Sequence, residues 1–167
     1  MKTQILRWMA ALLACLFVGP AWAETEVDKA LAAVAQGQYQ TAQLQLERLV
    51  NRQPERTDLR AAYAHCLLMN GDAEKAAGEI APALAKKPRN LDYLMLGIDI
   101  DIARQNWNGA DALIQRARTI KKHPPALYAR QAQVLEAMGR KADADATIEH
   151  YQTLIEPRLE TQTPPQQ

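Results

Sequence analysis

Two pairs of side chains in this sequence are of types that enzymes use for catalysis. His65 and Cys66 are adjacent, as a base and a nucleophile, and Asp99 and Asp101 lie two residues apart, as two carboxylates for acid–base work. Neither pair can act together in catalysis if the chain is helical there. Adjacent side chains on a helix diverge by roughly 100°, and side chains two residues apart point away from each other. We therefore expect Cys66 to be a packed core thiol rather than a nucleophile.

The other polar features of the sequence carry no clear chemistry. His123 and His150 have no Cys or His partner at the spacing of a metal site, and no glycine-rich loop could hold a phosphate group. Lys121, Lys122 and His123 form a short basic run that is typical of a solvated turn. A net charge of +1 over 167 residues argues against a nucleic-acid binder. We therefore expect no enzyme activity, no metal, no cofactor and no nucleic-acid partner.

The first 23 residues have the pattern of a secretory signal peptide. Lys2 and Arg7 supply a positive end, an uncharged apolar stretch follows over 8–18, and the small-x-small pattern over 21–23 favours cleavage. The apolar stretch is roughly half the ~20 residues that a helix needs to cross a bilayer, so a retained membrane anchor is not expected. The predicted product begins at Glu24 and is exported, to the periplasm.

A lipoprotein cleaved before Cys15 is the alternative to a simple signal peptide. The residues over 12–15 loosely resemble a lipobox, but the apolar residues over 16–18 would then follow the lipidated cysteine. We therefore expect Cys15 to be removed with the signal peptide. Cys66 is then the single cysteine of the product and cannot form an internal disulfide.

The elements that position these side chains repeat every 34 residues. Gly37, Gly71 and Gly139 lie 34 and 68 residues apart, and Gln105 occupies the missing position in that series. Three further columns, offset by four and then three residues, share one helix face. These columns are Ala42, Ala76, Ala110 and Ala144, then Leu46, Ile80, Ile114 and Ile148, then Leu49, Ala83, Ala117 and Tyr151.

Each repeat divides into two helices. Ala, Leu and Gln are strong helix formers, glycine favours the turn after the first helix, and proline ends the second. The prolines are Pro54, Pro88 and Pro157, while Pro82 is expected to kink its helix. We predict four units over 24–56, 57–90, 91–124 and 125–157, and a disordered polar tail over 158–167. The predicted helices span 24–36, 39–52, 57–70, 73–86, 91–105, 107–121, 125–138 and 141–155.

At these turns the chain resembles the tetratricopeptide repeat family. The segment 37–42, with Gly37, Tyr39 and Ala42, matches the family's turn closely, and the segment 71–76 matches it well. Leu96-Gly97 resembles a Leu-Gly pair of the family's first helix but lies one residue too far from Trp107, which predicts a one-residue slip in the third unit. The resemblance implies an all-α fold, an α-solenoid of about four antiparallel helix-turn-helix hairpins, and a non-enzymatic scaffold for other proteins.

The resemblance also implies that the first helix of each unit lines a concave groove that binds a peptide or helix of another protein. The Lys, Asn and Arg side chains with which some family members hold a peptide carboxylate are absent. Aliphatic, Met and Asp side chains favour an amphipathic or basic segment, although several aliphatics could instead pack between helices. The groove positions are Val27, Leu31, Val34, Asp58, His65, Leu68, Met69, Asp92, Met95, Asp99, Ile102, Gln133 and Glu136.

The C-terminal end of the predicted array has no capping helix after Ile155. Repeat arrays need a polar cap, so we expect Ile148, Tyr151 and Ile155 to present apolar surface to a partner or to a second copy. Two functions remain open. The first is an exported adaptor that serves envelope assembly, secretion or enzyme maturation, and the second is a structural oligomer joined through this end.

Overall fold

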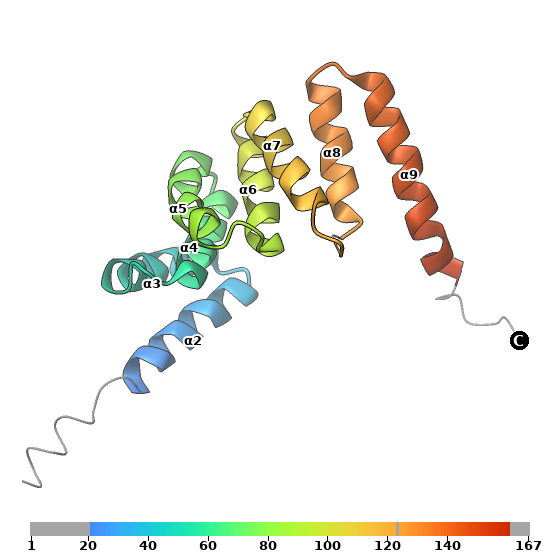
Figure 1. Ribbon diagram of the computed structural model, residues 1–167. Helices are drawn as coiled ribbons and strands as arrows, with labels where there is room; N and C mark the ends of the chain where they lie inside the picture. The colour runs from blue at the N-terminus through green and yellow to red at the C-terminus, as the bar shows by residue number, and fades with distance from the viewer. Residues whose placement is uncertain (1–20, 123, 161–167) are drawn as a thin grey trace, which may run out of the picture.

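The computed structural model describes residues 21–122 and 124–160, with the side chains of 25–122 and 124–153. This part of the chain contains eight helices and no strand (Figure 1). The all-α prediction is therefore confirmed. The helices are α2 (Ala21–Ala35), α3 (Tyr39–Arg52), α4 (Thr57–Met69), α5 (Ala73–Lys86), α6 (Leu91–Ala103), α7 (Trp107–Arg118), α8 (Ala126–Ala137) and α9 (Lys141–Glu160). None of the described helices is both long enough and apolar enough to cross a membrane.

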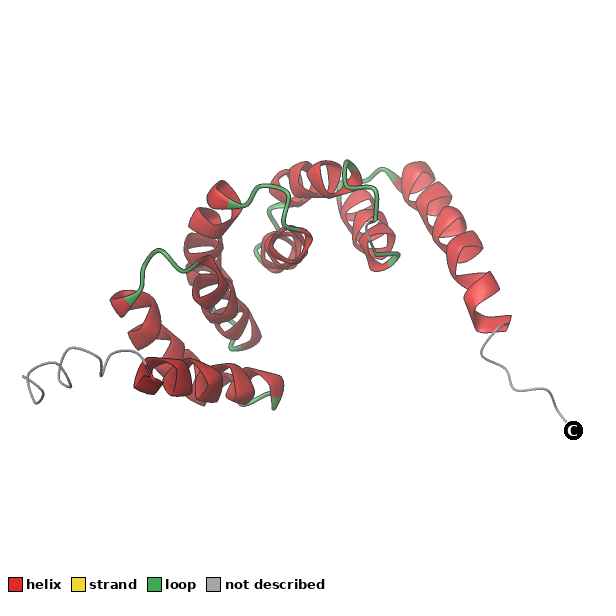
Figure 2. Ribbon diagram, turned by 60° about the horizontal axis from the view of Figure 1, so that its bottom comes forward, coloured by secondary structure: helices red, strands yellow, loops and turns green. Residues whose placement is uncertain are grey.

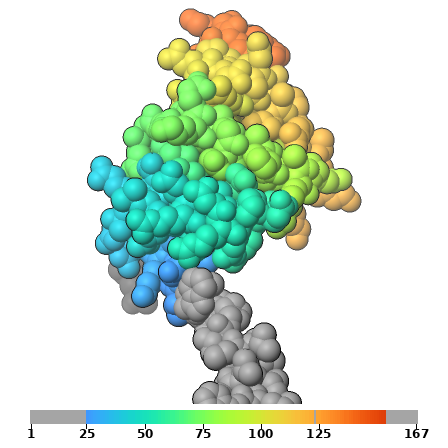
Figure 3. All heavy atoms as spheres, turned by 90° about the vertical axis from the view of Figure 1, so that its left-hand side faces the viewer, coloured from blue at the N-terminus to red at the C-terminus, as the bar shows by residue number. Residues whose placement is uncertain are grey.

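The helices pack in sequence order and form a curved stack. Each helix contacts the next one along the chain, and the first helices also contact one another, α2 with α4, α4 with α6 and α6 with α8. No comparable contact joins α3, α5, α7 and α9 among the described residues. Since the first helices lie closer together, they form the inner side of the arc in Figure 2. Figure 3 shows the successive pairs stacked directly on one another, so the fold is an α-solenoid.

One turn geometry joins the two helices of every pair. Gly37, Gly71 and Gly139 have positive φ angles of 72°, 88° and 77°. Gln105, at the fourth position of the series, also has a positive φ, of 57°. In all four turns this residue and the next donate backbone N–H bonds of 2.8–3.0 Å to carbonyls of the preceding helix. Glycine adopts this conformation without steric cost and glutamine does not, so the third turn carries strain that the others lack.

The third pair keeps the 34-residue register, so the predicted slip is wrong. Helices α4 and α6 each span 13 residues and begin 34 positions apart, at Thr57 and Leu91. Gly97 is needed at its own position, because an added Cβ would lie 2.9 Å from Leu113 Cδ1 and 3.2 Å from Leu84 Cδ1. The glycine lets α5 and α7 approach α6 and does not shift the helix.

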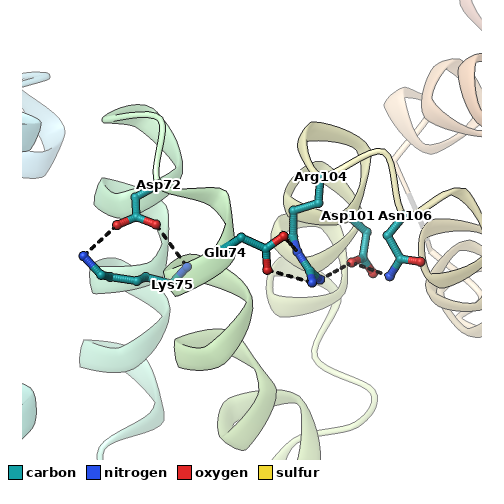
Figure 4. Close-up of polar contacts among 6 residues, drawn as sticks. All are labelled: Asp72, Glu74, Lys75, Asp101, Arg104 and Asn106. Atoms are coloured by element: carbon teal, nitrogen blue, oxygen red, sulfur yellow. Dashed lines mark hydrogen bonds and ion pairs between the residues drawn. The ribbon is translucent and has the colours of Figure 1, made fainter.

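Polar side chains brace the turn between α6 and α7 (Figure 4). Arg104 donates to Glu74 of α5, with an Nε–Oε1 distance of 3.0 Å, and to Asp101 at 3.2 Å. Asn106 donates from Nδ2 to Asp101 at 3.0 Å and caps α7 by accepting the N–H of Gly109 at 3.3 Å. A Cβ on Gly109 would lie 2.2 Å from Asn106 Nδ2, so the missing side chain leaves room for this bridge.

Proline does not end the last helix as predicted. Helix α9 continues through Pro157 to Glu160, and α5 likewise contains Pro82. Proline removes one N–H donor and crowds the carbonyl four residues earlier, yet both helices continue beyond their prolines. The predicted spans 39–52 and 73–86 are confirmed, and α4, α6, α7 and α8 are one to three residues shorter than predicted. Helix α2 begins at Ala21, so the predicted cleavage site lies in its first turn.

Candidate interaction surfaces

The pair His65 and Cys66 has no catalytic geometry. Cys66 is fully buried in the core of the first two helix pairs, and burial raises the pKa of its thiol to about 11. The thiol is therefore protonated at neutral pH and out of reach of solvent. His65 is half-buried, and its ring meets the Tyr39 ring edge-on at a centroid distance of 5.5 Å. The prediction of a packed core thiol is confirmed.

Asp99 and Asp101 point to different partners, as a helix requires. Asp99 accepts two hydrogen bonds from the Arg130 guanidinium on α8, one of them at 2.8 Å. Asp101 belongs to the bridge at the α6–α7 turn. His150 makes an edge contact with the Tyr128 ring at 5.0 Å, and His123 lies outside the described residues. The described part of the chain holds no group of three or more His, Cys, Asp or Glu side chains arranged for a metal ion.

The predicted groove positions divide into exposed residues and residues that pack between helices. Leu31 and Met69 are 39% and 50% exposed, and the polar side chains of Asp58, Asp92, Gln133 and Glu136 also face solvent. In contrast, the side chains at the remaining aliphatic positions are buried or pack against the core. Val27 is buried, Val34 and Leu68 pack on the core of the first two pairs, and Met95 and Ile102 pack on the core formed by α6, α7 and α8.

Arginine side chains already neutralise two of the three predicted groove aspartates. Arg56 donates to Asp58 at 2.5 Å, and this hydrogen bond holds the pKa of Asp58 below its usual value. Asp99 has Arg130 as its partner, and this contact raises the pKa of the arginine. Asp92 is exposed and has no ion-pair partner in the described part of the chain. The inner side is therefore less acidic than its three aspartates suggest.

The structure brings two of the predicted groove residues together with the predicted C-terminal contact. Gln133 and Glu136 of α8 and Ile148 and Tyr151 of α9 line one cleft of about 360 Å³ at the end of the stack. Ile148 is 42% exposed and Tyr151 is half-buried. The side chain of Ile155 lies outside the described residues.

Comparison with known proteins identifies the fold. A tetratricopeptide repeat family model matches residues 33–97, from the end of α2 into α6. A thermophilic tetratricopeptide repeat protein of Thermus thermophilus has a similar structure, with a TM-score of 0.66, 18% identity and coverage of 78% of this chain and 73% of that one. Residues 33–97 match the tetratricopeptide repeat family, and the described stack has the fold of solved tetratricopeptide repeat proteins. No curated protein sequence matched it.

Two further solved structures resemble this chain. One is a tetratricopeptide repeat protein of Parabacteroides merdae, with a TM-score of 0.62 and 17% identity over 75% of this chain and 49% of that one. The other is the Sgt2 tetratricopeptide repeat domain of Aspergillus fumigatus, with a TM-score of 0.51 and 17% identity over 89% of this chain and 88% of that one. At these identities the likeness concerns the fold, which is generally a scaffold for protein–protein interaction.

The sequence pattern did not predict one cleft of this protein. It measures about 350 Å³ and lies between α5 and α7 over α6, where the second helices diverge. Small side chains at Ala77 and Ala81 open it, and Leu84 and Leu113 form its apolar wall. The two alanines, which flank the repeat column on α5, are the sequence signal that could have indicated it.

Proposed function

We propose that this tetratricopeptide repeat protein is a non-enzymatic adaptor, exported to the periplasm, that binds a peptide or helix of a partner protein on its concave side. The observation that carries the proposal is the exposure of Leu31 and Met69 on the inner helices α2 and α4. Its place would be envelope assembly, secretion or the maturation of exported enzymes. Export itself rests on the signal-peptide pattern over 1–23.

The concave side offers both adaptable and orienting contacts. Fully burying a Leu or Met side chain contributes about 1.5–3 kcal/mol, so covering the exposed parts of Leu31 and Met69 contributes roughly 1–3 kcal/mol together. Methionine adapts its shape to varied partners, which suits a docking surface. The carboxylate of Asp92 then favours a positive charge on the bound segment.

Site-specific crosslinking tests which side of the stack binds. A photoreactive amino acid replaces Met69 on the inner helix α4 or, as a matched control, Leu44 on the outer helix α3, which is 61% exposed. In cells that make the full chain, we expect a discrete crosslinked protein from position 69 and none from position 44. The Leu31→Asp and Met69→Asp double variant should remove most of the partner captured by the unmodified chain. Equal crosslinking at both positions, or undiminished capture by the double variant, contradicts the proposal.

Export has a separate test. Cell fractionation followed by N-terminal sequencing should find the protein in the periplasm with Glu24 as its first residue. The Cys15→Ala variant should be processed in the same way, because the cysteine is removed with the signal peptide. An uncleaved protein in the cytoplasm refutes export, and loss of processing in the variant supports the lipoprotein alternative.

A further inference from the structure

The end of the stack exposes side chains that every earlier pair buries. Leu46, Ile80 and Ile114 are at most 3% exposed, whereas Ile148, the next member of their column, is 42% exposed. The third column behaves in the same way, since its earlier members Leu49, Ala83 and Ala117 are buried and Tyr151 is only half-buried. In the earlier pairs the first helix of the following pair stands over these positions, and no described element follows α9.

The covering helices share one pattern of apolar side chains. Tyr93 and Ile100 of α6 pack in the core formed by the two preceding pairs. Leu127 and Val134 of α8 pack in the same way on α6 and α7. Both pairs are seven residues apart, with a third buried position, Gly97 or Gln131, four residues after the first. A helix that covers the end of a pair therefore presents residues i, i+4 and i+7.

We propose that the C-terminal surface, formed by Ala132, Gln133, Glu136, Ile148 and Tyr151, binds an amphipathic helix of a partner protein in the place of a further first helix. That helix carries apolar residues at i, i+4 and i+7 and lysine or arginine at its flanks. This inference extends the proposed adaptor function, because it gives the protein a second docking surface beside the concave side.

The charge at the edge of the C-terminal surface selects a basic helix. Glu136 is exposed at one edge of the cleft, and Asp145, one turn before Ile148 on the same face of α9, is also exposed. Neither of these two carboxylates has an ion-pair partner among the described residues. Opposite charges across an interface guide association and exclude partners of like charge. Lysine or arginine beside the apolar stripe of the bound helix meets this requirement.

Neither residues 161–167 nor a second copy supplies a suitable covering helix. Residues 161–167 contain no aliphatic or aromatic side chain. A second copy that added its α2 would present Thr25, Lys29 and Ala32, the positions that correspond to Leu59, Tyr63 and Cys66 of α4, and would bury a lysine charge. Two copies joined end to end through their C-terminal surfaces would bring their acidic edges together. A basic helix from another protein avoids both penalties.

A designed peptide tests the proposal with a defined probe. The probe is a fluorescein-labelled, 18-residue alanine–lysine helix with leucine at i, i+4 and i+7, and its control has the same composition with the leucines distributed around the helix. Fluorescence anisotropy with the full chain should show at least tenfold tighter binding of the probe than of the control. Ile148→Asp should weaken probe binding at least tenfold, whereas Leu44→Asp, on an exposed leucine of α3, should leave it unchanged. Equal binding of the two peptides, or an unchanged Ile148→Asp result, overturns the proposal.

Two further measurements separate this inference from its alternatives. Sedimentation equilibrium should find the full chain monomeric, and a dimer that Ile148→Asp dissociates would overturn the proposal in favour of a second copy. The Leu31→Asp and Met69→Asp double variant should bind the probe as the unmodified chain does. If that variant lost probe binding, the proposal that the C-terminal surface binds separately from the concave side would be overturned. Probe binding retained without crosslinks at position 69 supports this inference while the concave-side function fails.

Discussion

The Gln105→Gly substitution should stabilise this protein. Gln105 holds the left-handed φ of 57° that Gly37, Gly71 and Gly139 hold in the other turns. Its side chain is exposed, and the bridge at the same turn is formed by Arg104 and its neighbours and does not use it. The substitution therefore changes the conformational preference of the backbone and leaves the surrounding contacts intact.

The expected gain follows from two opposing contributions. Left-handed backbone costs a non-glycine residue roughly 1–2 kcal/mol, and this strain disappears in the variant. Glycine in turn loses about 0.5–1 kcal/mol more conformational entropy on folding. The net gain in the free energy of unfolding is about 0.5–1 kcal/mol. For a chain of this size, that corresponds to a rise in Tm of roughly 1–4 °C.

Gly71→Gln is the matched reverse substitution. Gly71 has a φ of 88°, and a Cβ added there meets no atom within 4 Å, so steric contact does not obscure the backbone effect. Urea unfolding followed by circular dichroism should show a loss of about 0.5–1 kcal/mol for Gly71→Gln and a similar gain for Gln105→Gly. The reasoning is refuted if Gln105→Gly is destabilising, or if both variants match the unmodified chain.

Three further comparisons test the packing and the ion pairs. Because burial raises the pKa of Cys66 to about 11, its protonated thiol stabilises the fold below the unfolded-state pKa near 9, and this contribution of about 3 kcal/mol is lost as pH rises from 9 to 11. In a Cys15→Ala background, urea unfolding compares the chain that keeps Cys66 with the Cys66→Ala variant. The difference between their free energies of unfolding should shrink as pH rises from 9 to 11, and a constant difference contradicts the burial. Arg130→Gln, which leaves Asp99 without its donor, should lower the free energy of unfolding by about 1 kcal/mol, and a neutral result means that the contact does not hold α6 against α8. Ile114→Ala should cost roughly 2–5 kcal/mol and Ile148→Ala less than about 1 kcal/mol, so equal losses would show that the end of the stack is covered.

Local signals in the sequence account for most of the helix pattern. The bounds of α3 and α5 were predictable because glycine turns precede both helices and Pro54 and Pro88 follow them. The buried columns were predictable because the 34-residue period repeats one helix face. Gln105 could be recognised from that period as the missing member of the glycine series, but not from its own type, because glutamine disfavours a left-handed turn.

Contacts between distant residues account for what the sequence did not predict. Asp99 is neutralised by Arg130, which lies 31 residues later and on another helix. Val34 and Leu68 turn out to be packing residues because the angles between neighbouring helices decide which side of α2 and α4 is covered. Pro157 illustrates a local signal that misleads, since the loss of one donor does not end α9. The division into four units, the groove assignment and export remain predictions.

Hydrogen–deuterium exchange on the complex with the protein captured at position 69 tests the central claim most directly. If the concave side binds the partner, complex formation should slow exchange in α2, α4 and α6, and the exchange of α3, α5 and α7 should stay as in the free chain. Protection confined to α3, α5 and α7 would contradict the claim, because the partner would then occupy the outer side of the stack.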